Sequence, residues 1–232
     1  MLTPGLLISI LVYLLWITSL ILSLFFTLPD IVSFFMIPWL SFLYAGLFIQ
    51  AHDGMHGSIV PNYPRLNHFL SAIFVWSYAS FSYERLLVEH HKHHANSGHA
   101  DKDPDYHDGT HRGFLHWYAH FMLHYLSLKQ LFWQSILFFV LHNYFAIPTE
   151  KIILFWAIPS FLSTLQLFYF GTYKPHKDGT FLDHHRARSN DFPTWLSLLT
   201  CYHFGYHLEH HRNPGTPWWK LPELRRRAHI AD

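Results

Sequence analysis

Four stretches of the chain are apolar and long enough to cross a membrane as helices. They cover residues 5–28, 33–51, 131–147 and 152–170. A crossing helix needs roughly 17–25 mostly apolar residues. Short links join the first stretch to the second and the third to the fourth, and a long polar segment follows each pair. The pattern therefore predicts an all-α integral membrane protein with four transmembrane helices in two hairpins. Pro38 and Pro159 should kink their helices, which membrane bundles tolerate.

Two shorter stretches are apolar but repeatedly interrupted by polar residues. Residues 66–88 contain His68, several serines and Glu84, and residues 114–128 mix aromatic side chains with three histidines. Interfacial helices that lie along the membrane surface explain both stretches better than a fifth and a sixth crossing. A full crossing by residues 66–88 would also place the histidine motifs before and after it on opposite faces.

The positions of the basic residues predict the orientation. No Lys or Arg precedes Arg65, and only Lys151 lies between the third and fourth stretches. Cytoplasmic loops carry the excess of Lys and Arg, so we expect both long polar segments and both termini in the cytoplasm. The first apolar stretch has no basic residue before it and exceeds the core of an ordinary signal peptide, so we expect it to be retained.

Composition points to metal rather than to nucleic acid. The 232 residues include 22 His against 16 Lys plus Arg, with a formal net charge of +1, which gives no nucleic-acid signature and suggests metal binding. Cys201 is the single cysteine, so the chain alone cannot build an iron–sulfur cluster. It also has no GxGxxG turn for a dinucleotide. If the chemistry needs electrons, another protein must deliver them.

Three histidine motifs stand at helical spacing. The first, HxxxH, ends the second apolar stretch, and two HxxHH motifs follow in the polar segments. Residues at i, i+3 and i+4 share one helical face, so each motif can hold an ion. His91 points roughly 100° away from that face. The predicted ligands are His52 and His56, then His90, His93 and His94, then His207, His210 and His211.

The number of predicted ligands favours a pair of irons. Imidazole suits iron, copper or zinc, but a structural zinc needs only four ligands. The chain has no HExxH or HxxEH motif, which argues against a zinc membrane protease. Two iron ions that bind and activate O₂ fit eight or nine imidazoles better. The orientation places this di-iron site on the cytoplasmic face.

Other polar residues near the motifs have two interpretations. Asp53, Glu89 and Glu209 either orient ligands through the second ring nitrogen or are solvated residues at helix ends. The ladder at His116, His120 and His124 has ligand spacing, but its aromatic neighbours are typical of a membrane interface. We interpret the remaining histidines as ordinary surface or packing residues: His68, His99, His107, His111, His142, His184, His185 and His229.

Four segments resemble the β-carotene 4-ketolases of the membrane fatty acid desaturase/hydroxylase superfamily. The histidine motifs alone specify only the superfamily. The ketolase-like segments are Asp-Lys-Asp-Pro-Asp at 101–105, Phe-Gly-Thr-Tyr at 170–173 and Tyr-His-Phe-Gly-Tyr-His at 202–207, and residues 52–57 with the first motif also resemble the ketolases. The resemblance implies that residues 1–232 form one membrane desaturase-like domain.

The resemblance also adds candidates that spacing does not reveal. Related desaturases place an isolated histidine where His176 stands, often with an asparagine four residues earlier that holds a metal-bound water. Here that position is Thr172, which leaves the water contact open. His203 is either a tenth ligand or a neighbour of the ligands.

The reaction that the resemblance implies is oxidation of a carotenoid. Such enzymes use O₂ and two electrons from an external, ferredoxin-like donor to hydroxylate C4 of a β-ionone ring. A second hydroxylation gives a geminal diol, which loses water to leave a ketone, so β-carotene becomes echinenone and then canthaxanthin. The apolar substrate would enter from the bilayer past aromatic walls, for which Trp76, Tyr78 and Phe81 are candidates.

Two other functions stay open at this point. The nearer one is another di-iron membrane enzyme, either a carotenoid hydroxylase or an acyl-lipid desaturase. The more distant one is a haem- or metal-binding membrane carrier without turnover. Paired haem ligands usually face each other at membrane depth, whereas the histidine motifs here lie at the ends of the predicted spans.

Overall fold

The computed structural model describes residues 3–231, and side chains as far as residue 228. No β-strand occurs in this part of the chain, so the predicted all-α class is confirmed. The first helices along the chain are α1 (Pro4–Phe25), α2 (Asp30–Met55), α3 (Pro64–Ala79), α4 (Tyr83–Asn96), α5 (Phe114–Tyr125), α6 (Leu128–Phe139) and the π-helical η1 (Val140–Tyr144). Those that follow are α7 (Thr149–Ile152), the π-helical η2 (Ile153–Ala157), α8 (Ile158–Phe168), the π-helical η3 (Tyr169–Tyr173), α9 (Lys174–His176), α10 (Thr194–Cys201), α11 (His207–Arg212), the 3₁₀ turn η4 (Trp218–Lys220) and α12 (Leu221–Ala231).

Three helices in the described residues are long and apolar enough to cross a membrane. They are α1, α2 and the continuous helix Thr149–His176 that runs from α7 to α9, with mean hydropathies of 2.4, 1.9 and 1.6. The predicted stretch 131–147 forms α6 and η1, which have 12 and 5 residues and so give a helix of 17. This is the lower limit for a crossing, so the fourth span stays a prediction.

Prolines explain two wider turns in the helix Thr149–His176. The π-helical η2 ends directly before Ile158-Pro159, and η3 ends directly before Lys174-Pro175. A proline ring clashes with the carbonyl four residues earlier in a regular α-helix. A π-helical turn relieves that crowding, and such turns often lie at functional sites. The distortion expected at Pro159 is therefore present, while Pro38 lies inside α2 without interrupting it.

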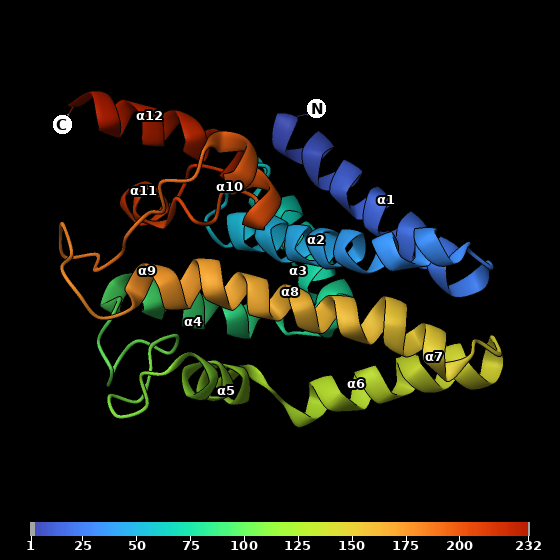
Figure 1. The fold of residues 1–232 in the computed structure, drawn as a ribbon. Helices are drawn as coiled ribbons and strands as arrows, with labels where there is room; N and C mark the ends of the chain where they lie inside the picture. Colours follow the sequence, from blue (N-terminus) through green and yellow to red (C-terminus); the bar gives the residue numbers. More distant parts are fainter. Residues whose placement is uncertain (1–2, 232) are drawn as a thin grey trace.

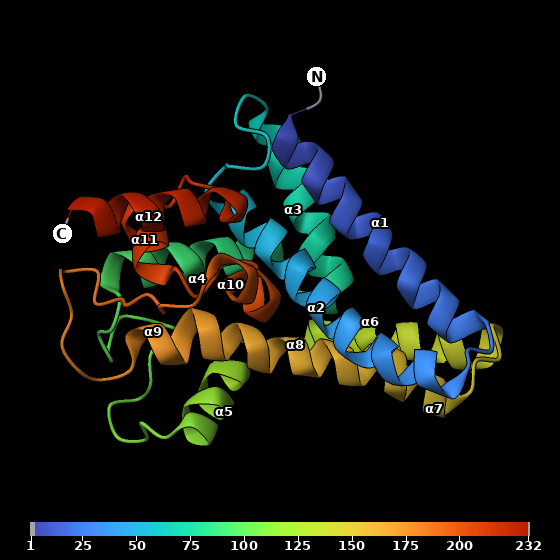
Figure 2. The same cartoon turned by 45° about the horizontal axis from the view of Figure 1, so that its top comes forward.

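The α1–α2 turn and the link between η1 and α7 meet at one end of the bundle. Nζ of Lys151 donates to the carbonyl oxygen of Phe26 at 2.7 Å, which satisfies a carbonyl that the end of α1 leaves free. The rings of Phe25 and Phe145 lie 5.6 Å apart, edge to face. Figures 1 and 2 place both links at the end of the molecule opposite α4, α11 and α12. The histidine motifs therefore lie at the other end.

The stretch 66–88 is divided between α3 and α4, so it is not the single helix that the sequence predicts, while its position at the membrane interface stays a prediction. The chain breaks at Ser80, which has a positive φ of 56°, and α3 packs against α2. It also lies beside α1 (Figure 2), where the rings of Tyr13 and Phe74 are 5.9 Å apart. Ser71 of α3 packs closely against Gly54 of α2. A Cβ added to Gly54 would lie 1.7 Å from Oγ of Ser71. The Tyr13 hydroxyl meets that of Ser77 at 3.3 Å. Close packing at Ser71 and the polar contact of Ser77 with α1 explain two of the serines that interrupt the apolar pattern.

Helix α2 is central to the bundle and positions the histidine end. It packs against α1, α3 and α8, and its second half is almost entirely buried. The absence of a side chain at Gly46 lets Tyr202 pack closely against α2, because a Cβ at this position would lie 2.5 Å from the Tyr202 hydroxyl. The Phe42 and Tyr202 rings stack at 4.3 Å. This contact brings the segment before α11 against the end of α2.

Candidate metal centre

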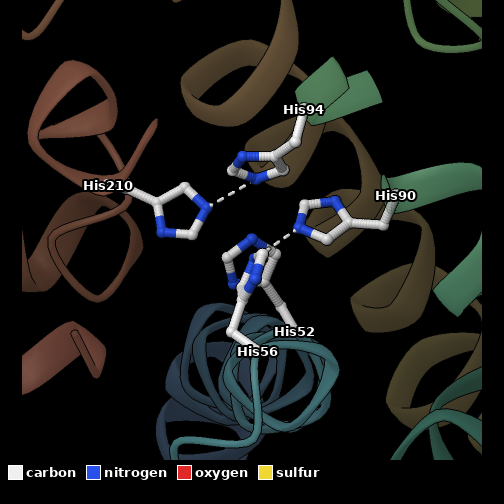
Figure 3. A group of neighbouring side chains, drawn as sticks. All are labelled: His52, His56, His90, His94 and His210. Atoms are coloured by element: carbon white, nitrogen blue, oxygen red, sulfur yellow. Dashed lines mark hydrogen bonds between the residues drawn. The ribbon is translucent and has the colours of Figure 1, made fainter. Parts of the chain in front are cut away.

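Nine histidines from four separate parts of the chain gather at one end of the bundle. They come from the end of α2, from α4, from α9 and from α11, and they form two groups whose possible ligand atoms lie within 4.8 Å of one another. The first group, shown in Figure 3, consists of His52, His56, His90, His94 and His210. The second consists of His93, His176, His207 and His211. These are the nine residues that the sequence and the resemblance propose as ligands.

Each HxxHH motif supplies both groups. His90 and His94 of α4 enter the first group, and His93 enters the second. In α11 the division is reversed, because His207 and His211 enter the second group and His210 the first. The two groups touch, since the rings of His94 and His211 stack with centroids 4.3 Å apart. Two metal positions side by side would therefore share both helices.

The nitrogen spacing fits metal coordination. Nε2 of His56 lies 2.8 Å from Nε2 of His90, and Nε2 of His94 lies 3.0 Å from that of His210. In the second group, Nε2 of His207 lies 3.0 Å from Nε2 of His176 and from Nε2 of His211. Ligands at right angles around an ion at about 2.1 Å would have nitrogens about 3.0 Å apart.

Burial gives these imidazoles the protonation state that a metal requires. Loss of solvent on burial lowers the pKa of His90, His210 and His211 well below the ordinary value, and the neighbouring histidines lower it further. The rings are therefore neutral at physiological pH and have a lone pair to offer. Both ring nitrogens of His52 are buried without a hydrogen-bond partner among the described residues. Such orphaned nitrogens are costly unless they bind an ion.

Asp103 orients one ligand. Its Oδ1 lies 2.8 Å from Nδ1 of His93, and its Oδ2 accepts from the amide of Gly98 at 2.8 Å. Burial by itself would lower the pKa of His93, but the carboxylates of Asp103 and Asp105 outweigh it and raise that pKa to about 9. The acids thus favour positive charge at this ring. They also fix the ring so that Nε2 faces the second group, the usual arrangement behind a metal-bound histidine.

His176 is held in place by a hydroxyl and a backbone carbonyl. Its Nδ1 lies 3.1 Å from Oγ of Ser97 and 2.9 Å from the carbonyl oxygen of Arg186. The carbonyl can only accept, so Nδ1 carries the hydrogen and Nε2 is left free for a metal. The π-helical η3 directly precedes α9, the short helix that ends in this histidine.

Gly171 lets an aromatic ring support the histidines. A Cβ at this position would lie 2.0 Å from Cε1 of Phe204, so only glycine permits the contact. The Phe204 ring in turn lies 4.8 Å from that of His52 and 5.0 Å from that of His207. This packing gives a physical role to two of the ketolase-like segments.

The three acids for which the sequence leaves two interpretations bond to partners other than the ligand nitrogens. Oδ1 of Asp53 is 3.6 Å from Nδ1 of His52, too long for a hydrogen bond, and its Oδ2 accepts from the Trp218 amide at 2.9 Å. Glu89 bonds to the Lys92 ammonium and the His124 ring. Glu209 bonds to Ser189 and Arg225. Each lies next to a ligand in the sequence, but helix geometry turns neighbouring side chains about 100° apart.

His203 lies outside both groups, although the sequence pattern places it one helical turn before His207. Tyr202 and His203 both have positive φ, 47° and 61°, and α11 begins only at His207. The chain therefore turns sharply before the helix, and the His203 ring stacks on Tyr206 at 5.7 Å. Thr172 is buried four residues before His176 and lines a cavity described below.

The remaining histidines mostly lie where the sequence analysis expected. His91 points away from both groups towards the Met55 carbonyl oxygen, 3.3 Å from its Nε2. His184 and His185 form a third group with Asp183, whose carboxylate accepts from Arg212 at 2.7 Å. The ladder of α5 joins no group in the described residues. The His229 side chain lies outside the described part of the chain.

An apolar cavity adjoins the two histidine groups. Four of the nine histidines line it, together with side chains of α2, α3, α4, α5 and α8. Tyr78 and Phe81, two of the predicted wall residues, are among them. Trp76, the third, is 45% exposed and meets Trp133 instead. The wall also contains Phe48, Asp105, Tyr125, Thr164, Leu167, Gly171, Thr172 and Phe204.

The sequence does not predict that Asp103 bonds to His93 or that Asp105 and Tyr125 line the cavity. The signal for the two acids was the Asp-Lys-Asp-Pro-Asp segment soon after the first HxxHH motif, which the resemblance singled out without a role. A carboxylate so near a histidine motif is a natural partner for a ligand nitrogen. Nothing in the pattern of residues 114–128 distinguishes Tyr125 from the other aromatic residues there.

Comparisons with known proteins agree with this geometry. The model of the family "Fatty acid desaturase" matches residues 29–153 and 133–231. A "Beta-carotene ketolase" of Paracoccus sp. is 42% identical over 207 residues, which cover 87% of this chain and 81% of that protein. "Beta-carotene 4-ketolase 3" of Haematococcus lacustris is 42% identical over 81% of this chain and 60% of its own length. "Zeaxanthin 4-ketolase" of Chlamydomonas reinhardtii is 40% identical over 83% of this chain and 44% of its own length.

Proposed function

The chain belongs to the fatty acid desaturase family, and we propose that within it the protein is a carotenoid ketolase that introduces a keto group at C4 of β-ionone rings. One observation carries the proposal: nine imidazoles meet beside an apolar cavity in a chain 42% identical to a β-carotene ketolase over most of its length. The protein is accordingly a membrane-bound oxidoreductase.

The two histidine groups would each hold one iron ion. Their buried imidazoles and the spacing of about 3 Å between facing nitrogens suit such ions. When bound, a pair of irons supplies the activation of O₂ and accepts electrons from an external, ferredoxin-like protein. The residues around them hold the ligands in place: Asp103 fixes His93, and Ser97 and the Arg186 carbonyl fix His176.

The proposed reaction consists of two successive hydroxylations at one carbon. In each, a ring C–H becomes C–OH, while one O₂, two electrons and two protons give the inserted oxygen and one water. The second hydroxylation yields a geminal diol, which loses water to leave the C4 ketone. β-Carotene would thus become echinenone when one ring reacts and canthaxanthin when both do.

The apolar wall of the cavity suits a hydrocarbon ring. Phe48, Phe81 and Leu167 line it together with His52 and His207, so a ring that enters would lie against the histidine groups with water excluded. We propose that the carotenoid enters from the bilayer. We also propose that α6 with η1 forms a fourth span and that the histidine end and both termini face the cytoplasm, where the basic residues gather.

Pigment analysis tests the function. Expression in a host that makes β-carotene should yield echinenone and canthaxanthin. His93→Ala, inserted in the membrane at the same level, should yield neither. An alcohol as the end product would indicate a hydroxylase, and a new double bond in an acyl chain a desaturase; either result contradicts the proposal. Purified protein should contain two irons per chain and show no haem absorbance.

A further inference from the structure

The wall of the cavity holds one carboxylate, and it lies beside the second histidine group. Asp105 accepts a hydrogen bond from the Tyr125 hydroxyl through Oδ1. Its Oδ2 lies 3.8 Å from Nδ1 of His93, too far for a hydrogen bond. Both side chains line the cavity together with His93 and His207. An acceptor oxygen is therefore available next to the place where we propose that the ring is oxidised.

Two other polar groups in the wall hold the helices together. The Tyr78 hydroxyl bonds to that of Ser163 at 2.8 Å, and Thr164 bonds to the Tyr118 hydroxyl. Asp105 differs because its hydrogen bond comes from a neighbour in the same wall. Thr172 also lines the cavity and offers a hydroxyl, but Asp105 offers the carboxylate of the wall, the stronger acceptor for a hydroxyl on a bound molecule.

The carboxylate is fixed in position by the backbone around it. The amide of Asp105 donates to Oδ1 of Asp103 at 2.9 Å, and Nε1 of Trp117 donates to the Asp105 carbonyl oxygen at 2.8 Å. Its side chain is only 13% exposed. Burying a carboxylate in an apolar wall is unfavourable unless it is hydrogen-bonded, and a single bond from Tyr125 leaves much of its acceptor capacity unused.

We propose that the Asp105–Tyr125 pair binds the hydroxyl of the singly oxidised ring and so retains the alcohol for its second oxidation. The inference rests on the proposed ketolase function. A ring that has not reacted has no hydroxyl donor, so the pair gains a partner only after the first hydroxylation. The pair accepts a hydrogen bond and exchanges no electrons, so the balance of each oxidation is unchanged. Asp105 and Tyr125 would then decide whether the reaction continues to the ketone or releases the alcohol.

The discrimination expected from such a pair is large enough to measure. A site that is built to bond a hydroxyl separates compounds with and without that group strongly, because the buried acceptor is otherwise unpaired. Hydrogen bonds to a charged group contribute more than neutral ones. Weakening the pair should therefore release alcohol in place of ketone, by a factor on the order of 10 in the product ratio.

The test is the ratio of C4 alcohol to C4 ketone made from β-carotene by the membrane-bound enzyme. Asp105→Asn should raise this ratio on the order of 10-fold, and Tyr125→Phe should raise it less, since the carboxylate remains. Supplied 4-hydroxylated carotene should be converted more slowly by both variants than by the unaltered enzyme. The matched control is Tyr118→Phe on the same helix, whose hydroxyl bonds to Thr164 and which should leave the ratio unchanged.

Three results would overturn the proposal. An unchanged ratio in both variants would show that the pair does not bind the hydroxyl. Equal loss of alcohol and ketone, with iron content reduced, would show that Asp105 only supports the ligand His93. An alcohol as the end product of the unaltered enzyme would instead refute the ketolase function on which the inference rests. Iron content per chain is measured for every variant to separate these cases.

Discussion

Helices α4 and α5 both carry histidines at ligand spacing, yet they differ completely in what those histidines meet. The ladder of α5 has His116 and His120 exposed, and His124 pairs with Glu89. The motif of α4 faces α2, α9 and α11, and its rings form two compact groups with theirs. Spacing along one helix is therefore only a condition for a metal site. What distinguishes α4 is that three other segments bring rings to the same place.

Removing a ligand from either histidine group should cause the largest loss of ketone formation. His93→Ala and His210→Ala each take one imidazole from a different group, so we expect no detectable ketone while the protein still inserts. This exceeds the loss of about 10–100-fold that is typical when only a ligand's hydrogen-bond partner is removed. Pigment chromatography and iron content of the purified variants measure it. Turnover near the normal level in either variant would contradict the assignment of the groups.

Removing the support of a ligand should produce the next largest effect. Asp103→Asn keeps the size of the side chain but weakens the hold on Nδ1 of His93. We expect iron affinity or activity to fall about 10–100-fold. Glu89→Gln is the matched control from α4, because its carboxylate bonds to Lys92 and His124 rather than to a ligand. If both variants lose activity equally, proximity to the histidines explains the effect better than the bond to His93.

A methyl group added behind the histidines should have a smaller effect, mainly on stability. Gly171→Ala places a Cβ 2.0 Å from the Phe204 ring, which must move towards His52 and His207. Overpacking of this kind costs about 1–3 kcal/mol, so the thermal unfolding midpoint in detergent should fall together with activity. Gly113→Ala, at the start of α5, is the control, because its Cβ meets no atom within 4 Å. Equal midpoints for the two variants would refute the packing role of Gly171.

Changing the ladder of α5 should have the smallest effect. His120→Ala removes an exposed ring that belongs to neither group, and exposed substitutions usually change stability by no more than about 0.5 kcal/mol. Ketone formation should stay within about twofold of normal. The same pigment assay decides the question. A loss as severe as that of His93→Ala would mean that the division between the two helices is wrong.

The sequence predicts the residues of the site better than its contacts. Helical spacing selects eight of the nine histidines, because residues three and four apart share a face whatever else the chain does. His176 stands alone, so only its resemblance to related proteins identifies it. The partition between two groups could not be predicted, because it depends on how α4 and α11 face each other across the bundle.

The errors have a common physical cause. Asp53, Glu89 and Glu209 were chosen because they adjoin ligands in the sequence, whereas Asp103 reaches His93 across a turn ten residues later. Likewise, the position of His203 assumed a continuous helix, and the left-handed backbone at residues 202 and 203 interrupts it. The stretch 66–88 was expected to form one helix, but the left-handed backbone at Ser80 divides it. Periodicity describes single helices well, but it does not describe contacts between them.

The alternation of neighbouring histidines between the two groups has a mechanical consequence. His93 and His94 are adjacent on α4, and His210 and His211 on α11, yet the members of each pair serve different groups. Consecutive residues of a rigid helix keep a constant rise and rotation. The geometry of α4 and α11 therefore fixes the distance between the two groups, whatever the conformation of the loops. A slip of either helix by one residue would misdirect rings at both positions at once. The two histidine groups therefore form together, and a displacement of α4 or α11 that disrupts one group also disrupts the other.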